Sequence, residues 1–241
     1  MTRGGDKSAN SGPQRSWLYR LIRAVTRLRL KYHYPRAERP NLLIGSFVFV
    51  AGTASVGTIA AVTLLFGHAL IFPSLAPTAF LVFYTPMAPT ACPRTVVCAH
   101  STAVLAGIGC TYLITLIWPG VQLVGTTDLN WARVVAIMVI MGAVSGFMAV
   151  GRFAHPPAAA SGLLPALGFL DDLGGAGGLI AGAFLLAGVA FLFNRGIAGL
   201  PYPLWRWDPE VVKKYGALAG LPSIAKSYSE TLKDGVSHPP D

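Results

Sequence analysis

Charged side chains are scarce in the centre of this 241-residue chain, and that scarcity excludes most soluble folds. Only 12% of the residues are charged, whereas 53% are hydrophobic; a globular domain usually has about 25% charged residues. Between residues 41 and 200 the charged residues are Arg94, Asp128, Arg133, Arg152, Asp171, Asp172 and Arg195. A soluble domain of this size needs much more polar surface. The composition therefore indicates a protein that crosses a lipid bilayer several times.

Combinations of residues that build active sites are also missing from the apolar centre. It contains no paired carboxylates, no set of metal ligands and no Ser/His/Asp arrangement, and Asp171 and Asp172 are expected in a loop. Cys92, Cys98 and Cys110 have no Cys-x-x-Cys spacing, which argues against a disulfide framework and a zinc site. We therefore expect a protein that is not an enzyme and that holds no cofactor and no metal.

Six apolar segments follow one another along the chain: residues 42–66, 70–91, 96–118, 131–151, 156–170 and 176–194. The first, third, fourth and sixth approach the ~20 residues that cross about 30 Å of hydrocarbon. The second and fifth contain prolines, among them Pro73 and Pro165, and proline breaks helical hydrogen bonding. The expected fold is all-α: a polytopic transmembrane helical bundle of four full spans and two short or re-entrant helices.

The arginines bear on the number of crossings. With six crossings, Arg94, Arg152 and Arg195 lie on the same side of the membrane as the basic N-terminal arm. With four, Arg94 and Arg152 move to the other side, so the positive-inside rule favours six. Arg133 does not fit, because it lies one turn inside a span. Re-entrant second and fifth segments would keep the number at four.

The chain is expected to have three parts: a basic cytoplasmic arm, a transmembrane domain and a cytoplasmic tail, over residues 1–40, 41–200 and 201–241. The arm carries ten Lys or Arg residues against two acids, and residues 16–32 predict an amphipathic helix lying in the interface. We expect the arm to bind anionic lipid headgroups and not nucleic acid. A helix that packs on a soluble partner is the alternative. Both termini are expected in the cytoplasm, with a bacterial inner membrane favoured over an organelle membrane.

The two halves of the apolar centre, residues 42–118 and 131–195, follow the same plan. Each has a span, a middle segment opened by a ring and a proline (FPSLAP or HPPAAA) and a Gly-rich span. Three segments per half is an odd number, so the halves would insert with opposite polarity. The pattern predicts an inverted repeat with broken middle segments, which is a recurring transporter design.

The proline-started middle segments also predict a binding site. Proline suits the first turn of a helix, and the N–H groups and positive dipole end of such a helix attract anions. Two such helix starts meeting inside the membrane would form an electropositive pocket. The candidate substrate-binding residues are Pro73, Ser74, Thr78, Arg94, His100, Arg152, His155, Pro156, Pro157 and Ala158. The alternative is structural: His155 at a satisfied helix junction, and Arg94 and Arg152 as interfacial charges that set orientation.

Two motifs carry a resemblance to a known family. HPPAAASGLL follows a span, PRTVVCAH precedes it in the chain, and together they resemble the HPP-motif integral membrane proteins over residues 42–207. The sequence departs from the usual family residues at Cys92, Thr95, Cys98, Ala99 and Ala159. The resemblance implies a compact membrane domain, commonly described with four spans. It also implies a link to nitrite, because plant-plastid and cyanobacterial relatives are associated with nitrite transport.

The function expected from these features is a membrane transporter or channel for a small anion, with nitrite the leading candidate. The alternative is a membrane anchor or sensor module without transport activity. The expected partners are the small anion and the anionic lipid headgroups, and a homo-oligomer is left open.

Overall fold

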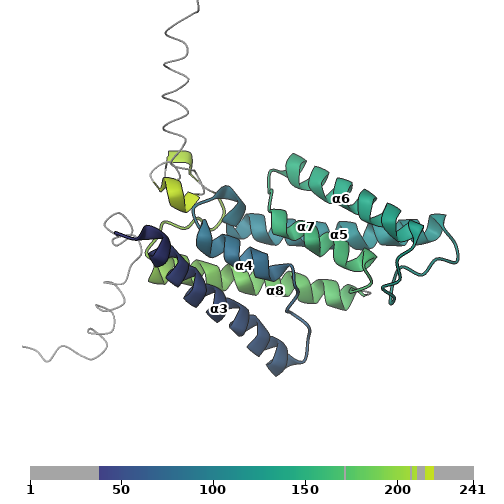
Figure 1. Ribbon diagram of the computed structural model, residues 1–241, viewed down its shortest axis with the longest axis horizontal. Helices are drawn as coiled ribbons and strands as arrows, with labels where there is room; N and C mark the ends of the chain where they lie inside the picture. Colours follow the sequence, from purple (N-terminus) through teal and green to yellow (C-terminus); the bar gives the residue numbers. More distant parts are fainter. Residues whose placement is uncertain (1–37, 171, 207, 211–214, 220–241) are drawn as a thin grey trace, which may run out of the picture.

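The computed structural model describes residues 38–170, 172–206, 208–210 and 215–219 (Figure 1). Helices are the only regular secondary structure in this part of the chain, which contains no strand. The helices are α3 (Pro40–Phe66), α4 (Leu75–Tyr84), α5 (Pro93–Ile117), α6 (Trp131–Gly151), α7 (Pro156–Ala166) and α8 (Leu173–Phe191), with the short turns η2 (Pro89–Ala91), η3 (Leu192–Ile197) and η4 (Gly216–Ala219). The predicted interfacial helix 16–32 lies outside the described residues.

Four of these helices are long enough to cross a membrane. They have 27, 25, 21 and 19 residues in α3, α5, α6 and α8, and a helix rises about 1.5 Å per residue. The other two have only 10 and 11 residues, so α4 and α7 reach about halfway. The predicted all-α membrane bundle of four full spans and two short helices is confirmed.

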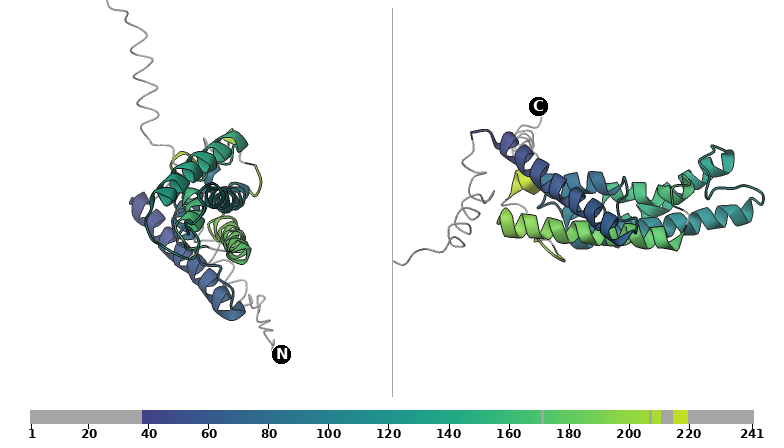
Figure 2. Two further views of the ribbon diagram at one scale, coloured as in Figure 1. Left: turned by 90° about the vertical axis from the view of Figure 1, so that its right-hand side faces the viewer. Right: turned by 90° about the horizontal axis from the view of Figure 1, so that it is seen from below.

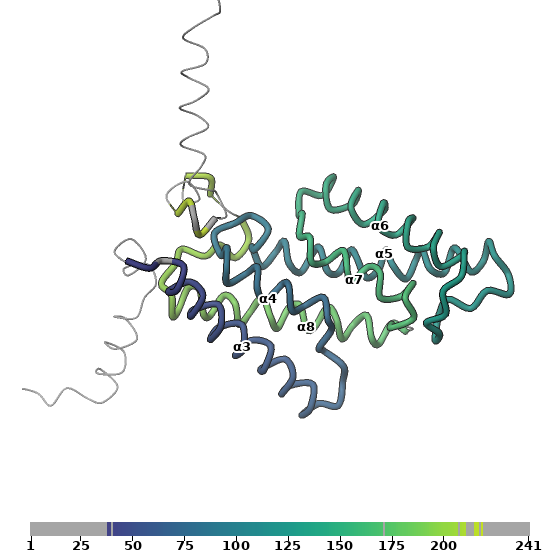
Figure 3. Tube along the Cα trace, viewed as in Figure 1, coloured from purple at the N-terminus to yellow at the C-terminus, as the bar shows by residue number. Residues whose placement is uncertain are grey.

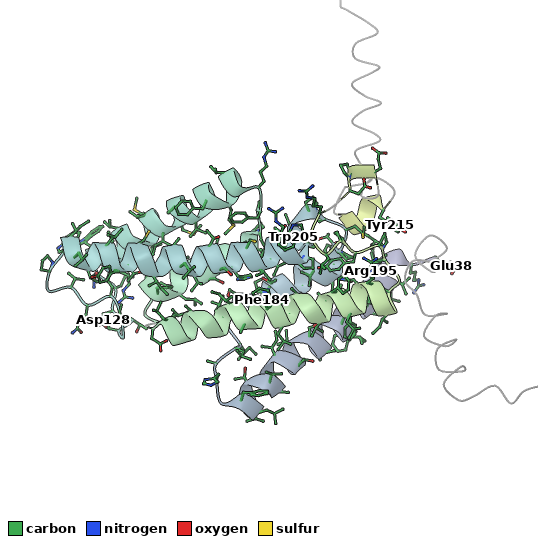
Figure 4. All side chains as sticks on the ribbon, turned by 180° about the vertical axis from the view of Figure 1, so that it is seen from behind. Glu38, Asp128, Phe184, Arg195, Trp205 and Tyr215 are labelled. Atoms are coloured by element: carbon green, nitrogen blue, oxygen red, sulfur yellow. The ribbon has the colours of Figure 1, made fainter. Side chains whose placement is uncertain are left out.

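The helices define two ends of an elongated bundle (Figure 2). The arginine end, named for Arg39, Arg94, Arg152, Arg195 and Arg206, contains the N-terminus of α3 and the residues after α8, where Ile44, Met87 and Leu200 pack together. Residues 118–130 lie at the opposite end, which we call the loop end, and the turns at residues 67–70 and 167–172 adjoin each other nearer the middle of the bundle (Figure 1). Arg195 and Trp205 lie at one end and Asp128 at the other (Figure 4).

The two short helices belong to broken crossings. Helices α3 and α5 both run from the arginine end towards the loop end, so the chain between them must travel the length of the bundle (Figure 3). It does so as an extended stretch, residues 67–74, followed by α4. Helices α6 and α8 run the opposite way, and α7 with the stretch before it makes the return passage. Successive helices from α3 to α8 therefore run in alternating directions along the bundle (Figure 3).

Glycines on α8 make room for the extended stretch of the second passage. A Cβ atom at Gly178 would collide with the Ala69 carbonyl oxygen, and one at Gly182 with the Leu70 carbonyl oxygen. The backbone N–H of Leu70 donates to Thr63 Oγ1 at 3.3 Å. The Ala69 and Leu70 carbonyls therefore lie against α8, whereas His68, Ile71 and Pro73 in the same stretch are exposed at the surface of the bundle.

Arg133 does not behave as an orienting charge. Its side chain is only 1% exposed. The guanidinium donates to the Ala166 carbonyl oxygen at 2.5 Å and to the Thr126 carbonyl oxygen at 2.8 Å. Ala166 is the last residue of α7, whose C-terminal carbonyls carry partial negative charge. Arg133 therefore ties α6 to the end of α7, which explains why it did not fit the positive-inside pattern.

The chain after the last span packs back onto the bundle. The Tyr202 hydroxyl, fully buried, donates to the Ala91 carbonyl oxygen at 2.5 Å. The Met87 N–H donates to the Leu218 carbonyl oxygen at 2.9 Å. These contacts cover the connection between α4 and α5 at the arginine end.

Candidate functional site

A group of five polar side chains lies buried in the middle of the apolar bundle. Ser74 is 2% exposed, and Thr78, His100, His155 and Ser161 have no exposed surface. We call these five residues the polar cluster. They come from α4, α5 and α7 and the residues that cap them. Burying polar groups in such surroundings is costly unless they bond to one another.

Local sequence explains how each side chain reaches this place. Ser74 caps α4, and Thr78 follows one turn later on the same face. His155 caps α7 in an extended conformation, and Pro156 and Pro157 then occupy the first two helical positions, where no N–H donor is missed. His100 lies about two turns inside α5, whose start is likewise fixed by a proline.

Three hydrogen bonds meet at the hydroxyl of Thr78. Oγ1 lies 3.0 Å from the Ser74 carbonyl oxygen, 2.9 Å from His100 Nε2 and 3.0 Å from His155 Nε2. The two imidazole rings have their centroids 5.3 Å apart and are tilted by 58°. The two histidines are thus joined through one threonine hydroxyl.

The other atoms of the rings extend this chain of hydrogen bonds in both directions. His100 Nδ1 lies 2.7 Å from Ser161 Oγ, which lies 2.8 Å from Ser74 Oγ. His155 Nδ1 lies 2.7 Å from the Thr90 carbonyl oxygen. Because a carbonyl oxygen only accepts, Nδ1 of His155 carries a hydrogen, and Nε2 of the neutral ring is an acceptor.

The first turns of α4 and α7 lie together, but not as two free helix ends facing a pocket. Ser161 reaches Ser74, and His155 reaches Thr78, so the helices overlap side by side. The first N–H groups are already used: Leu75 N donates to the Phe72 carbonyl oxygen and Ala158 N to that of His155. The expected pocket of free N–H groups is therefore wrong in this respect. Imidazole and hydroxyl groups occupy the space instead.

A cavity of about 490 Å³ opens at the arginine end, next to the polar cluster. Its lining residues are Pro89, Thr90, Cys92, Arg94, Thr95, Arg152, Ala154, Trp205 and Arg206. We call it the arginine vestibule, because three arginines line it and, among the residues that the structure describes, no carboxylate does. The Thr90 carbonyl that accepts from His155 belongs to a lining residue, so the polar cluster ends at the vestibule wall.

Side chains around the vestibule keep its charge positive. The guanidinium of Arg94 lies 5.5 Å from the centroid of the Trp205 ring, a cation–π contact that holds it at the wall. Burial raises the pKa of the Cys92 thiol, and its Sγ lies 3.7 Å from the Leu204 carbonyl oxygen. Cys92 therefore stays a neutral thiol at pH 7 and adds no negative charge.

The backbone of Arg152 is in a conformation that usually belongs to glycine. Its φ is 54° and its ψ 39°, and among the described residues it is the only non-glycine with positive φ. The left-handed region costs about 1–2 kcal/mol for a residue with a Cβ. Arg152 ends α6 in this conformation, and its N–H donates to the Ala149 carbonyl oxygen at 3.3 Å.

An apolar layer follows the polar cluster towards the loop end. Val104 lies one turn beyond His100 on α5, and Leu164 lies three residues beyond Ser161 on α7. They pack with Leu170 and Leu179, and with Phe72 just before α4. The polar groups thus reach from the vestibule to the middle of the bundle and stop at this layer.

Most predicted site residues fall into one of these two regions. Ser74, Thr78, His100 and His155 form the polar cluster, and Arg94 and Arg152 line the vestibule. The remaining candidates start the short helices: Pro73 precedes α4, and Pro156, Pro157 and Ala158 form the first turn of α7. Ser161 joins the polar cluster as a small hydroxyl residue of the apolar centre, like Ser74 and Thr78, although it is not among the candidate binding residues. Sequence reasoning missed Arg206 in the vestibule. Arg206 stands between two tryptophans in PLWRWDP, a pattern that signals an interface but not a cavity.

The family model described as HPP, transmembrane region, matches residues 37–203. No curated protein and no solved structure matches the chain. The matched range contains the six α-helices α3 to α8 of the described residues, the whole polar cluster, and Arg94 and Arg152 of the vestibule. The chain is therefore an integral membrane protein that belongs to the HPP transmembrane family.

Proposed function

We propose that this membrane protein transports a small anion, with nitrite the leading candidate. The observation that carries the proposal is the arginine vestibule: Arg94, Arg152 and Arg206 line one cavity without a carboxylate, and the cavity ends at the buried polar cluster. Cavities lined by charge of one sign raise the local concentration of the opposite ion. A basic cavity that leads to polar groups inside a bilayer protein suits an anion on its way across.

The size of the vestibule supports a small substrate without fixing which one. A water molecule takes about 30 Å³ of liquid volume, so a cavity of about 490 Å³ admits a small anion together with water. Arginine forks recognise planar oxyanions such as nitrite in pairs of hydrogen bonds.

The distribution of charge supports a cytoplasmic arginine end. Its five arginines outnumber the described acids near them in the chain, Glu38, Asp208 and Glu210. The loop end carries Asp128 and Asp172 with a single arginine, the buried Arg133. By the positive-inside rule this distribution favours the cytoplasm for the arginine end, and we propose the same side for both termini. A bacterial inner membrane is the membrane we propose.

Uptake of nitrite into liposomes that contain the purified full chain tests the proposal. We expect uptake above that of protein-free liposomes, and a loss of about tenfold at low nitrite in Arg94→Ala. A unit charge at contact distance contributes between about 1 and 4 kcal/mol near a protein surface, and about 1.4 kcal/mol corresponds to tenfold.

Arg39→Ala is the matched control, because it removes the same charge from the same end at an exposed position outside the vestibule. Its uptake should equal that of the wild type. Flux at the protein-free level for nitrite, nitrate, formate and chloride alike would remove the transport proposal and leave the anchor or sensor module.

A further inference from the structure

The hydroxyl of Thr78 has one hydrogen, yet three hydrogen bonds meet at its oxygen. The Ser74 carbonyl can only accept, so the hydroxyl hydrogen goes to that bond. The bonds from the two Nε2 atoms then each need a hydrogen of their own. A threonine oxygen has two lone pairs, so it can accept both.

Only one of the two neutral histidines can supply that hydrogen. His100 can carry its hydrogen on Nε2, because its Nδ1 can accept from the hydroxyl of Ser161, and the Ser74 hydroxyl then supplies the hydrogen between the two serines. His155 cannot, because its single hydrogen is on Nδ1, donating to the Thr90 carbonyl. The bond between His155 Nε2 and Thr78 therefore lacks a hydrogen in the neutral cluster. One added proton on His155 Nε2 completes every bond.

That added proton makes a buried positive charge with nothing to balance it. The groups around His155 are the Thr90 carbonyl, the Thr78 hydroxyl and the His100 ring. The vestibule beyond adds Arg94, Arg152 and Arg206, which repel a proton, and the neutral thiol of Cys92. No carboxylate lines either region among the residues that the structure describes. An unbalanced buried charge is costly, so the counter-charge must come from solution.

We propose that the protein carries one proton together with each anion, and that the proton binds at Nε2 of His155, between this ring and Thr78. This inference rests on the proposed anion transport and names its coupling ion. The anion in the vestibule balances the imidazolium charge, and the proton in turn offsets the charge of the anion. Neither binds well alone, which ties the two movements together.

The proton step is balanced by water. An N–H bond forms at His155 Nε2 as an O–H bond of hydronium breaks and leaves water, and the reverse step returns the proton to water after transport. No electron moves, and the neutral ring is restored. Because the proton and a monovalent anion together carry no net charge, they cross the apolar layer of Val104, Leu164, Leu170 and Leu179 at less cost than a lone ion.

Liposomes that contain the full chain and a pH-sensitive dye measure the ratio of protons to nitrite directly. We expect one proton per nitrite, and uptake unchanged when valinomycin and a potassium gradient impose a membrane potential. Protein-free liposomes run in parallel correct for nitrous acid that crosses lipid unaided. Protein-dependent uptake that follows the potential and moves no proton would overturn this inference and leave anion transport standing. Absence of any protein-dependent uptake would overturn both.

A pair of substitutions at Thr78 links the ratio to this site. Thr78→Ser keeps the hydroxyl and should keep the one-to-one ratio. Thr78→Val has nearly the same shape but offers no oxygen to His155, so we expect coupled uptake to fall at least tenfold. Equal coupled uptake in Thr78→Val and the wild type would contradict the proposal. A circular-dichroism spectrum and elution volume like those of the Ser variant would show that the Val variant is folded.

Discussion

The two ends of the bundle use arginine in opposite ways. At the arginine end, Arg94, Arg152 and Arg206 line a cavity and leave their charge available to solution. At the loop end, Arg133 is buried and its guanidinium is bound by the carbonyls of Thr126 and Ala166. The comparison shows that the role of a cation in a membrane protein depends on whether backbone carbonyls already hold it. Substitutions of arginine should therefore lower transport at the arginine end and the stability of the fold at the loop end.

The largest expected effect is at the loop end. Arg133→Ala removes the donors of two carbonyls and leaves a void, so we expect the free energy of unfolding to fall by about 3 kcal/mol. Denaturation by sodium dodecyl sulfate in mixed micelles measures it. Arg39→Ala, at an exposed position, should stay within about 0.5 kcal/mol of the wild type. An equal, small loss in both variants would contradict the structural role of Arg133.

The next effect concerns the glycines that accommodate the extended stretch. Gly182→Ala puts a Cβ against the Leu70 carbonyl oxygen, and the backbone must shift, so we expect a loss of about 2 kcal/mol in the same assay. Gly177→Ala is the matched control on the same helix, because no atom lies within 4 Å of a Cβ there. It should be neutral or stabilising, since alanine favours helix by up to about 1 kcal/mol. Equal stability of both variants would mean that residues 67–74 do not press on α8.

At the arginine end the expected effect is on transport. Arg152→Ala should lower nitrite uptake about tenfold, equivalent to about 1.4 kcal/mol, with little change in stability, because its side chain is exposed in the vestibule. Uptake at nitrite concentrations below saturation, together with thermal unfolding of the same sample, separates the two quantities. A loss of stability without a loss of uptake would mean that Arg152, like Arg133, has a structural role and no role in transport.

The smallest expected effect is a difference in stability between two substitutions of Arg152 that should lower uptake equally. Arg152→Gly removes the same charge but relieves the left-handed backbone, so we expect it to be more stable than Arg152→Ala by about 1 kcal/mol. Uptake should be equally low in the two variants. A lower stability of the glycine variant would contradict an energetic cost of the left-handed backbone conformation at Arg152.

Much of the fold was predictable from segment length, proline and charge. The long apolar segments predicted four spans, and Pro73 and Pro156 marked the short helices. The number of crossings that Arg94 and Arg152 favour remains a prediction. HPPAAASGLL and PRTVVCAH predicted the family. These signals are local, and a sequence carries them directly. The inverted repeat remains a prediction.

The chemistry of the site was only partly predictable. Thr78 and His155 are 77 residues apart, and nothing local indicates that both rings bond one hydroxyl. The proline starts were right for helix geometry but did not reveal that the first N–H groups already had partners. Arg133 seemed to break the charge rule because its carbonyl partners come from two other elements. The hydrogen-bond partners of these groups depend on how the helices pack side by side, and that packing joins residues that are far apart in the sequence.

The hydroxyl of Tyr202 makes the residues after the last span part of the folded membrane domain. A shortened chain that ended at the last apolar span, near Leu200, would strip the Ala91 carbonyl of its donor and the Met87 N–H of its acceptor. Both groups sit in the link between α4 and α5, beside the residues that line the vestibule. Expression of residues 38–219 should therefore keep the cavity intact, whereas removal of everything after Leu200 should loosen it while all four long helices remain.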